Sequence, residues 1–575
     1  MATYYYAEGG TAANKAAATG DGDISTFMSP AVAVSESAGF SAGDSCLASS
    51  IGGTIRLTAR MDLGSSGSSG SPITWGAKSG ESPVIKGSVI INSASYNWTE
   101  SSTSGEWFCR TSADGNPSLI DPGSGLFFVD GTSMGTKGTL GALTDQQWGF
   151  GDNDSLGYDV LYFCNATDPG ALGVDIEVAQ VSCMYAYGKS YLTIDGISFQ
   201  HGHLGEYVGG LLVSGGTNVI VQNCEFHWCN GNGVAIKGDY HTVDNCTASY
   251  CGSHNISAGG FVGDPSTYMT LSNNVSHHSR SLLFSGSAPW DGYGLKFLFV
   301  TDSVMFGNTT YANGMQGIDL DGSHGDAVGC YDCHVYDNLV YGNYYQGILV
   351  EIFSDRNKVY RNLVYDNGLS TEGGGLAGYE IGITHVCHDN EIFNNVIYMS
   401  KAKSEAGKEK LIGINEYDAS YDCHGTLIYG NTMVGGGYAD NAVYIDGYTS
   451  AENTIIKNNS MTGFASVPIL VAGTGFTGFY VDYNCLRRDP YNADIMTLDW
   501  TGYTLAELAS SSYGGSDNIG DAQSFTNAGS HDYSLASDSP CIGVALNTLG
   551  APYNNGILPS AAWPSSVTSG DRDNY

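Results

Sequence analysis

Short runs of alternating apolar and polar residues follow one another along most of the chain. Two examples are Gly317-Ile-Asp-Leu-Asp321 and Gly347-Ile-Leu-Val-Glu-Ile352, in which the alternation has a period of two. This period predicts β-strands, because helical periodicity within these coils never extends beyond about one turn. Glycine after nearly every run supplies the bends between strands. The pattern therefore predicts an all-β chain made of many short strands.

An asparagine recurs at the same place in the runs from about residue 186 onward. It is found at Asn223, Asn245, Asn274, Asn308, Asn338, Asn362, Asn395, Asn431 and Asn459. Successive members are 22 to 36 residues apart, which suits a coil of fixed size that carries loops of varied length. A corner asparagine can bond the asparagines of the coils above and below, and it tolerates left-handed backbone angles. We therefore expect a solenoid of stacked strands.

These coils resemble the right-handed parallel β-helix superfamily of pectate lyases, polygalacturonases and phage tailspikes. Tyr4-Tyr5-Tyr6-Ala-Glu-Gly-Gly and Gly53-Thr-Ile-Arg-Leu-Thr58 are similar to its opening coils, and Asp532-Tyr-Ser-Leu535 is similar to its closing segment. The resemblance implies a right-handed single-stranded parallel β-helix with capped ends and long lateral loops. We expect an N-terminal cap and irregular first coils with long insertions over residues 1–185, regular coils with asparagine corners over 186–485, and a closing segment over 486–575.

The charge balance narrows the function. The 575 residues include 22 Lys+Arg and 58 Asp+Glu, which gives a formal net charge of −36. Nucleic-acid binding is not expected, because affinity for a phosphate backbone depends on many basic contacts. Membrane insertion is not expected, since the longest apolar run, around Val467 to Ala472, is far shorter than the ~20 residues of a spanning helix. The first residues show no secretory leader, which leaves an extracellular protein whose leader was removed or a component of a virion surface.

Several of the 14 cysteines fall into columns. Cys224 and Cys246 are 22 residues apart, as are Cys229 and Cys251. Buried thiols stacked inside the solenoid and disulfides within the columns both fit this spacing. The stretch Cys330-Tyr-Asp-Cys333-His334 matches the c-type haem attachment pattern. Because Cys330 is already explained by a third column, with Cys387 and Cys423, we do not expect haem.

Charged residues gather on one predicted face of the coils. If Ile318, Leu320, Ile348 and Val350 point inward, the alternation places Asp319, Asp321 and Glu351 outside. The same reasoning exposes Lys237, Lys296 and Glu380 on other coils. Adjacent coils are about 4.8 Å apart, so the outward groups Lys296, Asp319, Asp321, Glu351 and Glu380 would form one stripe. The loop that contains Trp290 would wall a groove beside it.

Two chemistries suit this stripe. In calcium-assisted β-elimination of a uronic-acid polysaccharide, a lysine of lowered pKa removes a proton and Ca²⁺ neutralises the substrate's acid. Lys296 would be the base, with Asp319, Asp321 and Glu351 as ligands of Ca²⁺. In glycoside hydrolysis, two carboxylates about 5 to 9 Å apart act as acid and as base or nucleophile, and Asp321 and Glu351 are expected in that range. In either case Trp290, Lys237 and Glu380 are candidates for contact with substrate.

A second resemblance concerns the region of the stripe. Asp291-Gly-Tyr-Gly-Leu-Lys296-Phe followed by Asn313-Gly-Met-Gln-Gly-Ile-Asp319-Leu resembles the part of family nine pectate lyases that pairs a catalytic lysine with a calcium-binding segment. The resemblance implies a lyase that uses Lys296 and Ca²⁺. This chain has Met315-Gln316-Gly317 where that family has acidic residues, so only part of the calcium pocket is present.

These features predict an extracellular or virion-associated protein that binds an acidic extracellular polysaccharide and, as an enzyme, depolymerises it by β-elimination. The alternative is a non-catalytic fibre, spike, filament or surface decoration that uses the β-helix as a rigid scaffold. Such a protein would form a homotrimer or another surface assembly. Outward carboxylates also fit a simpler interpretation, in which they only keep the strand faces polar and soluble. The sequence leaves these alternatives open.

Overall fold

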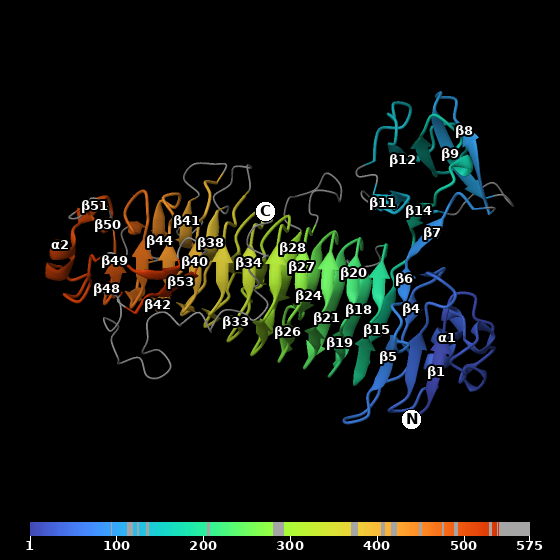
Figure 1. Cartoon of the computed structure of the whole chain (residues 1–575), viewed down its shortest axis with the longest axis horizontal. Helices are drawn as coiled ribbons and strands as arrows, with labels where there is room; N and C mark the ends of the chain where they lie inside the picture. Colours follow the sequence, from blue (N-terminus) through green and yellow to red (C-terminus); the bar gives the residue numbers. More distant parts are fainter. Residues whose placement is uncertain are drawn as a thin grey trace. The chain divides into compact units, whose positions relative to one another are not determined.

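A computed structural model of the chain describes residues 1–93, 95–111, 119–122, 126–133, 137–203, 208–279, 292–369, 378–403, 409–415, 423–447, 451–473, 476–487, 493–521, 523–527, 532–537 and 539. The chain divides into two compact units. Unit 1 comprises Met1–Ser257 and His278–Gly292, and unit 2 comprises Ala258–His277 and Tyr293–Tyr575. In both units each coil contributes strands to parallel sheets, which we number 1 to 3 (Figure 1). No described helix is long and apolar enough to cross a membrane.

Unit 1 contains the first coils. Sheet 1 consists of β1 (Thr3–Tyr6), β2 (Ser45–Ala48), β5 (Ile73–Ala77), β16 (Leu192–Asp195), β19 (Ile220–Gln222) and β22 (Thr242–Asp244). Sheet 2 consists of β3 (Ile55–Arg56), β6 (Val84–Lys86), β17 (Ser198–Gln200), β20 (Glu225–His227) and β23 (Thr247–Ser249). Sheet 3 consists of β4 (Met61–Asp62), β15 (Met184–Tyr187), β18 (Val208–Thr217) and β21 (Asn232–Asp239).

Unit 2 repeats the arrangement. Sheet 1 consists of β26 (Thr270–Ser272), β30 (Val304–Phe306), β33 (His334–Tyr336), β36 (Lys358–Tyr360), β39 (Glu391–Phe393), β42 (Leu427–Tyr429), β45 (Ile455–Lys457) and β48 (Tyr480–Asp482). Sheet 2 consists of β27 (Val275–His277), β31 (Thr309–Tyr311), β34 (Leu339–Tyr341), β37 (Leu363–Tyr365), β40 (Val396–Tyr398), β43 (Thr432–Val434), β46 (Ser460–Thr462) and β49 (Cys485–Leu486). Sheet 3 consists of β28 (Tyr293–Leu298), β32 (Ile318–Asp321), β35 (Ile348–Glu351), β38 (Tyr379–Thr384), β41 (Lys410–Asn415), β44 (Asn441–Asp446), β47 (Ile469–Ala472) and β50 (Met496–Leu498), and β51 (Thr501–Tyr503) adds an antiparallel edge.

An insertion in unit 1 separates β6 from β15. One of its sheets is formed by β7 (Ser88–Ile90), β10 (Phe127–Val129), β11 (Thr132–Ser133) and β14 (Ile176–Ala179), and the other by β8 (Tyr96–Glu100), β9 (Glu106–Thr111), β12 (Trp148–Gly151) and β13 (Val160–Cys164). All of their pairings are antiparallel. Trp98, Phe127, Trp148 and Phe163 share one apolar core there. The insertion therefore has a core of its own, distinct from the stacked coils.

A ladder of asparagines runs inside unit 2. It contains Asn274, Asn308, Asn338, Asn362, Asn395, Asn431, Asn459, Asn484 and Asn518, and each donates through Nδ2 to the Oδ1 atom of the next at 2.9 to 3.1 Å. Asn362 also donates to the Val335 carbonyl at 2.9 Å. These bonds satisfy polar groups that burial would otherwise leave unpaired. The ladder thus locks neighbouring coils in register.

Two of the predicted corner asparagines occupy a different position. Asn223 and Asn245 also bond each other, at 2.7 Å, but they lie on the surface of unit 1, and the buried position after them is held by Cys224 and Cys246. Asn223 and Asn245 have the expected left-handed angles, with φ values of 54° and 50°, but this expectation was wrong for the other seven predicted asparagines. From Asn274 to Asn484, the positive φ belongs to the residue before each ladder asparagine, for example 55° at Asn273. The column cysteines are free thiols.

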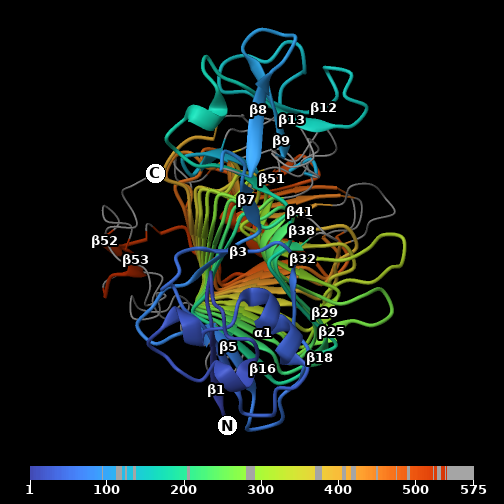
Figure 2. The ribbon, with the colours of Figure 1, turned by 90° about the vertical axis from the view of Figure 1, so that its right-hand side faces the viewer.

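Short helices and a returning segment complete the ends. In unit 1, α1 (Pro30–Ser37) begins at the N-cap Ser29 and lies at the N-terminal end of the coils (Figure 2). In unit 2, α2 (Leu505–Ser510) follows β51 and is closed by a capping box between Thr504 and Glu507. The hairpin of β52 (Phe525–Asn527) and β53 (Asp532–Leu535) then packs its aromatic side chains against an outward apolar cluster on sheet 2. This hairpin covers apolar surface that the strands leave outside.

Candidate functional site

Neighbouring strands of sheet 3 in unit 2 bring four ionisable side chains together. Lys296 of β28 is in register with Asp319 of β32. Asp321 ends β32 and Glu351 ends β35 on the next coil. The alternating residues Phe297, Leu320 and Val350 are completely buried, because they point into the coil. The four ionisable groups therefore lie on the outer side of three consecutive strands.

Lys296 holds two of the carboxylates by ion pairs. Its Nζ atom lies 3.0 Å from Asp319 Oδ2 and 2.6 Å from Asp321 Oδ2. The same ammonium lies 3.8 Å from the centre of the Tyr293 ring, which is a cation–π contact. The expected exposure of this stripe was wrong: Lys296, Asp319 and Glu351 are at most 7% exposed, and only Asp321 is appreciably open, with 14% of its side chain exposed. The ion pairs make this burial of charge possible.

Burial and crowding change the proton affinities of the site. Burial raises the pKa of Asp319 to about 7, although Lys296 acts in the opposite direction. Burial, with Asp319 and Asp321 nearby, raises the pKa of Glu351 well above its usual range. Burial would lower the pKa of Lys296, but Tyr293 and the three carboxylates outweigh it and raise that pKa well above its ordinary value. The lowered pKa that a lysine base needs is therefore not what this geometry produces.

The three carboxylates also form a set of oxygen ligands. Oxygen atoms of Asp319, Asp321 and Glu351 all lie within 4.8 Å of one another. Oδ1 of Asp319 is buried and accepts no hydrogen bond from any described residue. Hard cations such as Ca²⁺ prefer several carboxylate oxygens, so these groups fit such an ion in ligand type. Lys296 contacts the Oδ2 atoms of both aspartates and would compete with the ion for them.

Left-handed backbone angles follow the site strands. Ile352 and Phe353 have φ values of 52° and 56° after Glu351, and His385 and Val386 both have 62° in the next coil. Such angles are unfavourable for β-branched residues, by about 1–2 kcal/mol each. They bring His385 Nδ1 to 3.9 Å from Glu351 Oε2. Strained backbone of this kind is concentrated at functional sites.

The structure places Glu380 away from this cluster, and its predicted outward orientation was wrong. Glu380 is completely buried, and its Oε2 atom accepts a hydrogen bond from Asn367 Nδ2 at 2.7 Å. Lys403 pairs with the same carboxylate at 3.3 Å. The Tyr379 ring lies against Gly413, while Glu380 ends a second asparagine ladder through Asn313, Asn343 and Asn367. Glu380 therefore has a structural surrounding.

The remaining predicted residues are not part of the cluster. Lys237 belongs to unit 1, where it lies on β21 in register with Ser214. Trp290 lies outside the described residues. In contrast, Tyr293 and His385 contact the cluster although sequence reasoning did not select them. Tyr293 is three residues before Lys296, and His385 follows the residue in register with Glu351, so only the register shows that they meet.

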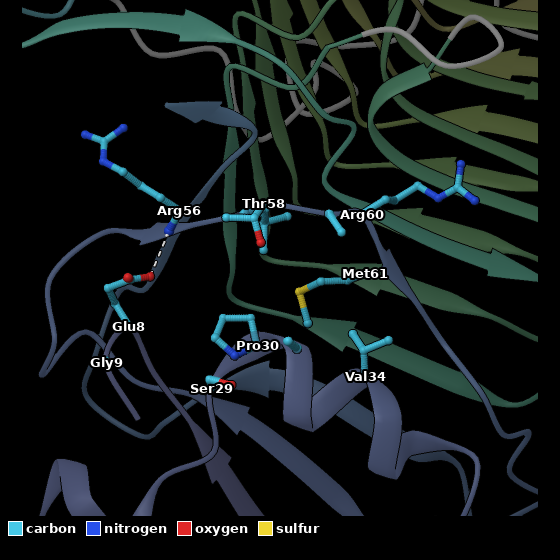
Figure 3. Close-up of a pocket in the computed structure, with 12 residues that line it drawn as sticks. Glu8, Gly9, Ser29, Pro30, Val34, Arg56, Thr58, Arg60 and Met61 are labelled. Atoms are coloured by element: carbon cyan, nitrogen blue, oxygen red, sulfur yellow. Dashed lines mark hydrogen bonds between the residues drawn. The ribbon is translucent and has the colours of Figure 1, made fainter. Parts of the chain in front are cut away.

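A cavity of about 570 Å³ lies in unit 1, at the N-terminus of α1 (Figure 3). Pro30, Val34 and Met61 line it together with the stems of two arginines. The arginines turn their charged groups elsewhere: Arg56 pairs with Glu177 at 3.0 Å and Arg60 pairs with Asp62 at 2.6 Å. The cavity therefore offers little free polar chemistry, and the cluster around Lys296 is the candidate site.

Comparison with known proteins agrees with this architecture. Residues 182–397 match the family model described as a right handed beta helix region. The chain is similar in structure to a protein described as XylC in complex with xylose (15% identity, TM-score 0.53, 82% of this chain and 86% of that one) and to one described as a glycoside hydrolase (11%, 0.51, 78% and 97%). It is also similar to the N-terminal fragment of gene product 12 of bacteriophage Phi29 (12%, 0.50, 80% and 68%). No curated protein matches the chain.

The stacked parallel sheets and the matched family model define the class of the protein. The chain has the fold of a right-handed parallel β-helix, and residues 182–397 match the family model of that region. At identities of 11 to 15% the similar structures show the fold alone.

Proposed function

We propose that this protein cleaves a glycan by hydrolysis, with Asp321 and Glu351 as the reacting pair. The observation that carries the proposal is their spacing: carboxylate oxygens of the two residues, on adjacent coils, lie within 4.8 Å of one another. Glycosidases that retain anomeric configuration use two carboxyl groups about 5–5.5 Å apart. The pair is therefore close enough for a carboxylate nucleophile and unsuited to an inverting mechanism, which needs room for a water molecule between them.

The surroundings of the two carboxyl groups assign their roles. Glu351 is buried beside two aspartates, and its raised pKa keeps a proton that it can give to the glycosidic oxygen. Asp321 is the more open group and is paired with Lys296, so its carboxylate attacks the anomeric carbon as the bond to the leaving sugar breaks. Glu351, now deprotonated, then takes a proton from water, which displaces Asp321 from the sugar. Lys296 orients Asp321 throughout.

The similar structures support a carbohydrate ligand. Two of them are described by their titles as a protein in complex with xylose and as a glycoside hydrolase. Both share the β-helix fold with this chain. Sugar chemistry on this fold is therefore consistent with the proposal, while the roles of Asp321 and Glu351 depend on the geometry of this chain.

Calcium-assisted β-elimination is the second candidate. It is favoured by the three clustered carboxylates and by the Oδ1 atom of Asp319, which accepts no hydrogen bond within the described part of the chain. When bound, Ca²⁺ would supply the positive charge that neutralises an acidic sugar. Lys296 would have to act as the base, and its raised pKa makes proton removal unfavourable. We therefore rank this candidate below hydrolysis.

A panel of neutral and acidic polysaccharides separates the two reactions. Hydrolysis releases reducing ends without absorbance near 235 nm, whereas elimination produces that absorbance and is lost with chelator. We expect hydrolysis that falls at least about 100-fold in Glu351→Gln and Asp321→Asn, with unchanged activity in the surface variant Asp332→Asn. Absence of new reducing ends on every polymer would refute catalysis and leave a binding or scaffold role. An activity that survives in both variants would refute this site.

We further propose an extracellular or virion-surface location, in a homotrimer or another surface assembly. The structural similarity to a bacteriophage Phi29 gene product gives this proposal its support. Mass spectrometry of purified virus particles and of cell-free medium tests the location, and light scattering of the purified chain tests the assembly. A monomer recovered only from cell interiors would contradict both.

A further inference from the structure

The outer face of sheet 3 carries a second cluster beyond the cleaving pair. It consists of Lys410 on β41 and Tyr444 and Asp446 on β44. Lys410 Nζ lies 3.6 Å from the centre of the Tyr444 ring, and the Tyr444 hydroxyl donates a hydrogen bond to Asp446 Oδ2 at 2.8 Å. All three side chains are half-buried. A cation, an aromatic ring and a carboxylate are thus fixed together on the strand face.

The register relates this second cluster to the first. Glu351 is followed in its column by Thr384, Asn415 and Asp446, so three coil steps separate Asp446 from Glu351. At about 4.8 Å per coil this is about 14 Å along the stack. A single sugar ring cannot reach both clusters. A chain of several sugars can.

Glycine occupies two positions on the strand face between the clusters. The column from Asp319 to Tyr444 passes through Leu349, Gly382 and Gly413. A Cβ atom at Gly413 would lie 2.6 Å from carbon atoms of the Tyr379 ring, so this ring lies across the glycine. Glycine here permits a close approach that no other residue allows. The Tyr379 ring supplies an apolar surface between the two clusters, which suits the face of a sugar ring.

Lys410 differs from Lys296, the lysine of the first cluster, because it forms no ion pair with any residue that the structure describes. Among the described residues no carboxylate lies within 4.0 Å of its ammonium, and its contact is the ring of Tyr444. Burial lowers the pKa of Lys410 despite Asp446, Asp440 and Glu409 nearby. These three acids surround it at longer range. The ammonium therefore has donor capacity available for a ligand, inside a region whose local charge is negative.

The charge of this face distinguishes neutral from acidic sugars. Among the described residues, Lys296 lies near the carboxyl groups of Asp319, Asp321 and Glu351, and Lys410 lies near those of Asp446, Asp440 and Glu409. A uronate placed here would bring another negative charge into an excess of carboxylates. A neutral sugar instead offers hydroxyl groups that donate to Asp446 and accept from Lys410.

We propose that the Lys410–Tyr444–Asp446 cluster is a distal sugar-binding site and that the ligand is a neutral glycan chain lying across sheet 3 from Asp321 and Glu351 to Tyr444. The inference rests on the proposed function for the direction of the chain, but the binding site itself does not require catalysis. It changes the substrate class from the acidic polysaccharide expected from the sequence to an uncharged one.

Calorimetry on the Glu351→Gln chain tests the site without turnover. The probes are xylohexaose, cellohexaose and maltohexaose, with hexagalacturonate and hexamannuronate as acidic counterparts. We expect a neutral hexasaccharide to bind and to lose about tenfold in affinity in Lys410→Met and in Tyr444→Ala, which corresponds to the loss of one charged hydrogen bond or one stacking contact. The disaccharide of the same sugar binds alike in all variants. Lys457→Met is the matched control, because Lys457 lies over Tyr480 in the same manner on sheet 1.

Several outcomes would overturn the proposal. Equal affinities of the parent, Lys410→Met and Tyr444→Ala for the neutral hexasaccharide would refute the distal site. Tighter binding of a hexauronate than of every neutral probe, or no binding of any probe, would refute a neutral glycan as the ligand. Binding that depends on Lys410 without hydrolysis by the unmodified chain would sustain the site and refute the proposed function. If Lys410→Met and Tyr444→Ala, made in the otherwise unmodified chain, hydrolyse long glycans at the parental rate, the proposed function stands and the distal site is refuted.

Discussion

At the scale of single residues, the central feature is one lysine between two aspartates. Lys296 pairs with Asp319 and Asp321 and contacts Tyr293 in a nearly dry environment. Taking charges out of water costs several kcal/mol per ion, and close pairing repays part of it. Asp319 has no solvent contact, and its Oδ2 atom pairs with Lys296. The protonation of Asp319 therefore changes with pH in the neutral range.

This sensitivity gives a stability prediction. In the unfolded chain Asp319 loses its proton near its ordinary pKa of 3.8, whereas in the folded chain its pKa is raised to about 7. Between these values the folded state binds more protons, so the contribution of Asp319 to stability falls as pH rises. Asp319→Asn removes this loss, which amounts to at most about 4 kcal/mol. We expect the variant to gain stability relative to the parent from pH 4 to 7 and no further above pH 7.

Urea denaturation at pH 4, 5.5, 7 and 8.5, in buffer with chelator, measures this difference. Asp332→Asn is the control, because Asp332 pairs with Arg356 on the surface, where such pairs contribute about 0–1 kcal/mol. Parallel pH profiles for Asp319→Asn and the parent would contradict the raised pKa.

At the scale of elements, the buried asparagine ladder is what makes one coil fit the next. Each member satisfies donors and acceptors of two neighbouring coils, and Asn362 lies in the middle of the series. In unit 1 the thiols of Cys224 and Cys246 hold the equivalent position. The position therefore needs a small group that can accept a hydrogen bond from the coil before it.

Removing one ladder member should weaken unit 2 strongly. Asn362→Ala leaves the backbone and side-chain nitrogen atoms of Asn338 without their acceptor and the Val335 carbonyl without its donor. Unsatisfied buried groups cost about 1–3 kcal/mol each, so the loss of three bonds should lower the free energy of unfolding by at least about 3 kcal/mol. Thermal and urea denaturation measure it.

A matched control lies in the residue before a ladder member. Asn394 has a φ of 55°, and glycine occupies the same position before Asn308 and Asn431. Asn394→Gly should therefore change stability by less than about 1 kcal/mol. A loss as large as that of Asn362→Ala would show that the ladder is not the source of the effect.

At the scale of the whole molecule, the net charge of −36 is the dominant property. Repulsion among so many carboxylates opposes the folded state and is screened beyond about 10 Å at 0.1 M salt. We expect the melting temperature to rise with NaCl. At equal ionic strength, CaCl₂ should raise the melting temperature further only if a cation binds the carboxylates of Asp319, Asp321 and Glu351. At a concentration of 100 Kd, such binding would add about 2.7 kcal/mol to the free energy of unfolding.

Differential scanning calorimetry of the parent and of Glu351→Gln makes the comparison. An extra effect of CaCl₂ that disappears in the variant would support the second candidate function. Equal effects of the two salts at matched ionic strength would show that calcium acts only by screening. A melting temperature that does not rise with NaCl would contradict the role of net charge.

The sequence by itself determined the class of fold and much of the placement of the cluster. Period-two alternation orients each strand, and the repeated asparagines mark the coils, because both are local patterns. The same patterns place Lys296, Asp319, Asp321 and Glu351 on one face. The alternation predicted the wrong orientation for Glu380, however, because this side chain is buried and bonds the end of the second asparagine ladder. It also misaligned Asn223 and Asn245 by one residue.

Only the tertiary structure decided the chemistry of the site. Burial depends on which residues of neighbouring coils and corners cover a side chain. The spacing of residues along the sequence does not predict this. The structure therefore revealed the pairs of Lys296, the direction of its pKa and the contacts of Tyr293 and His385. It also joined Lys410 to Tyr444 across two coils. Proton affinity and ligand class follow from distances between chain segments, whereas the fold follows from the period within each segment.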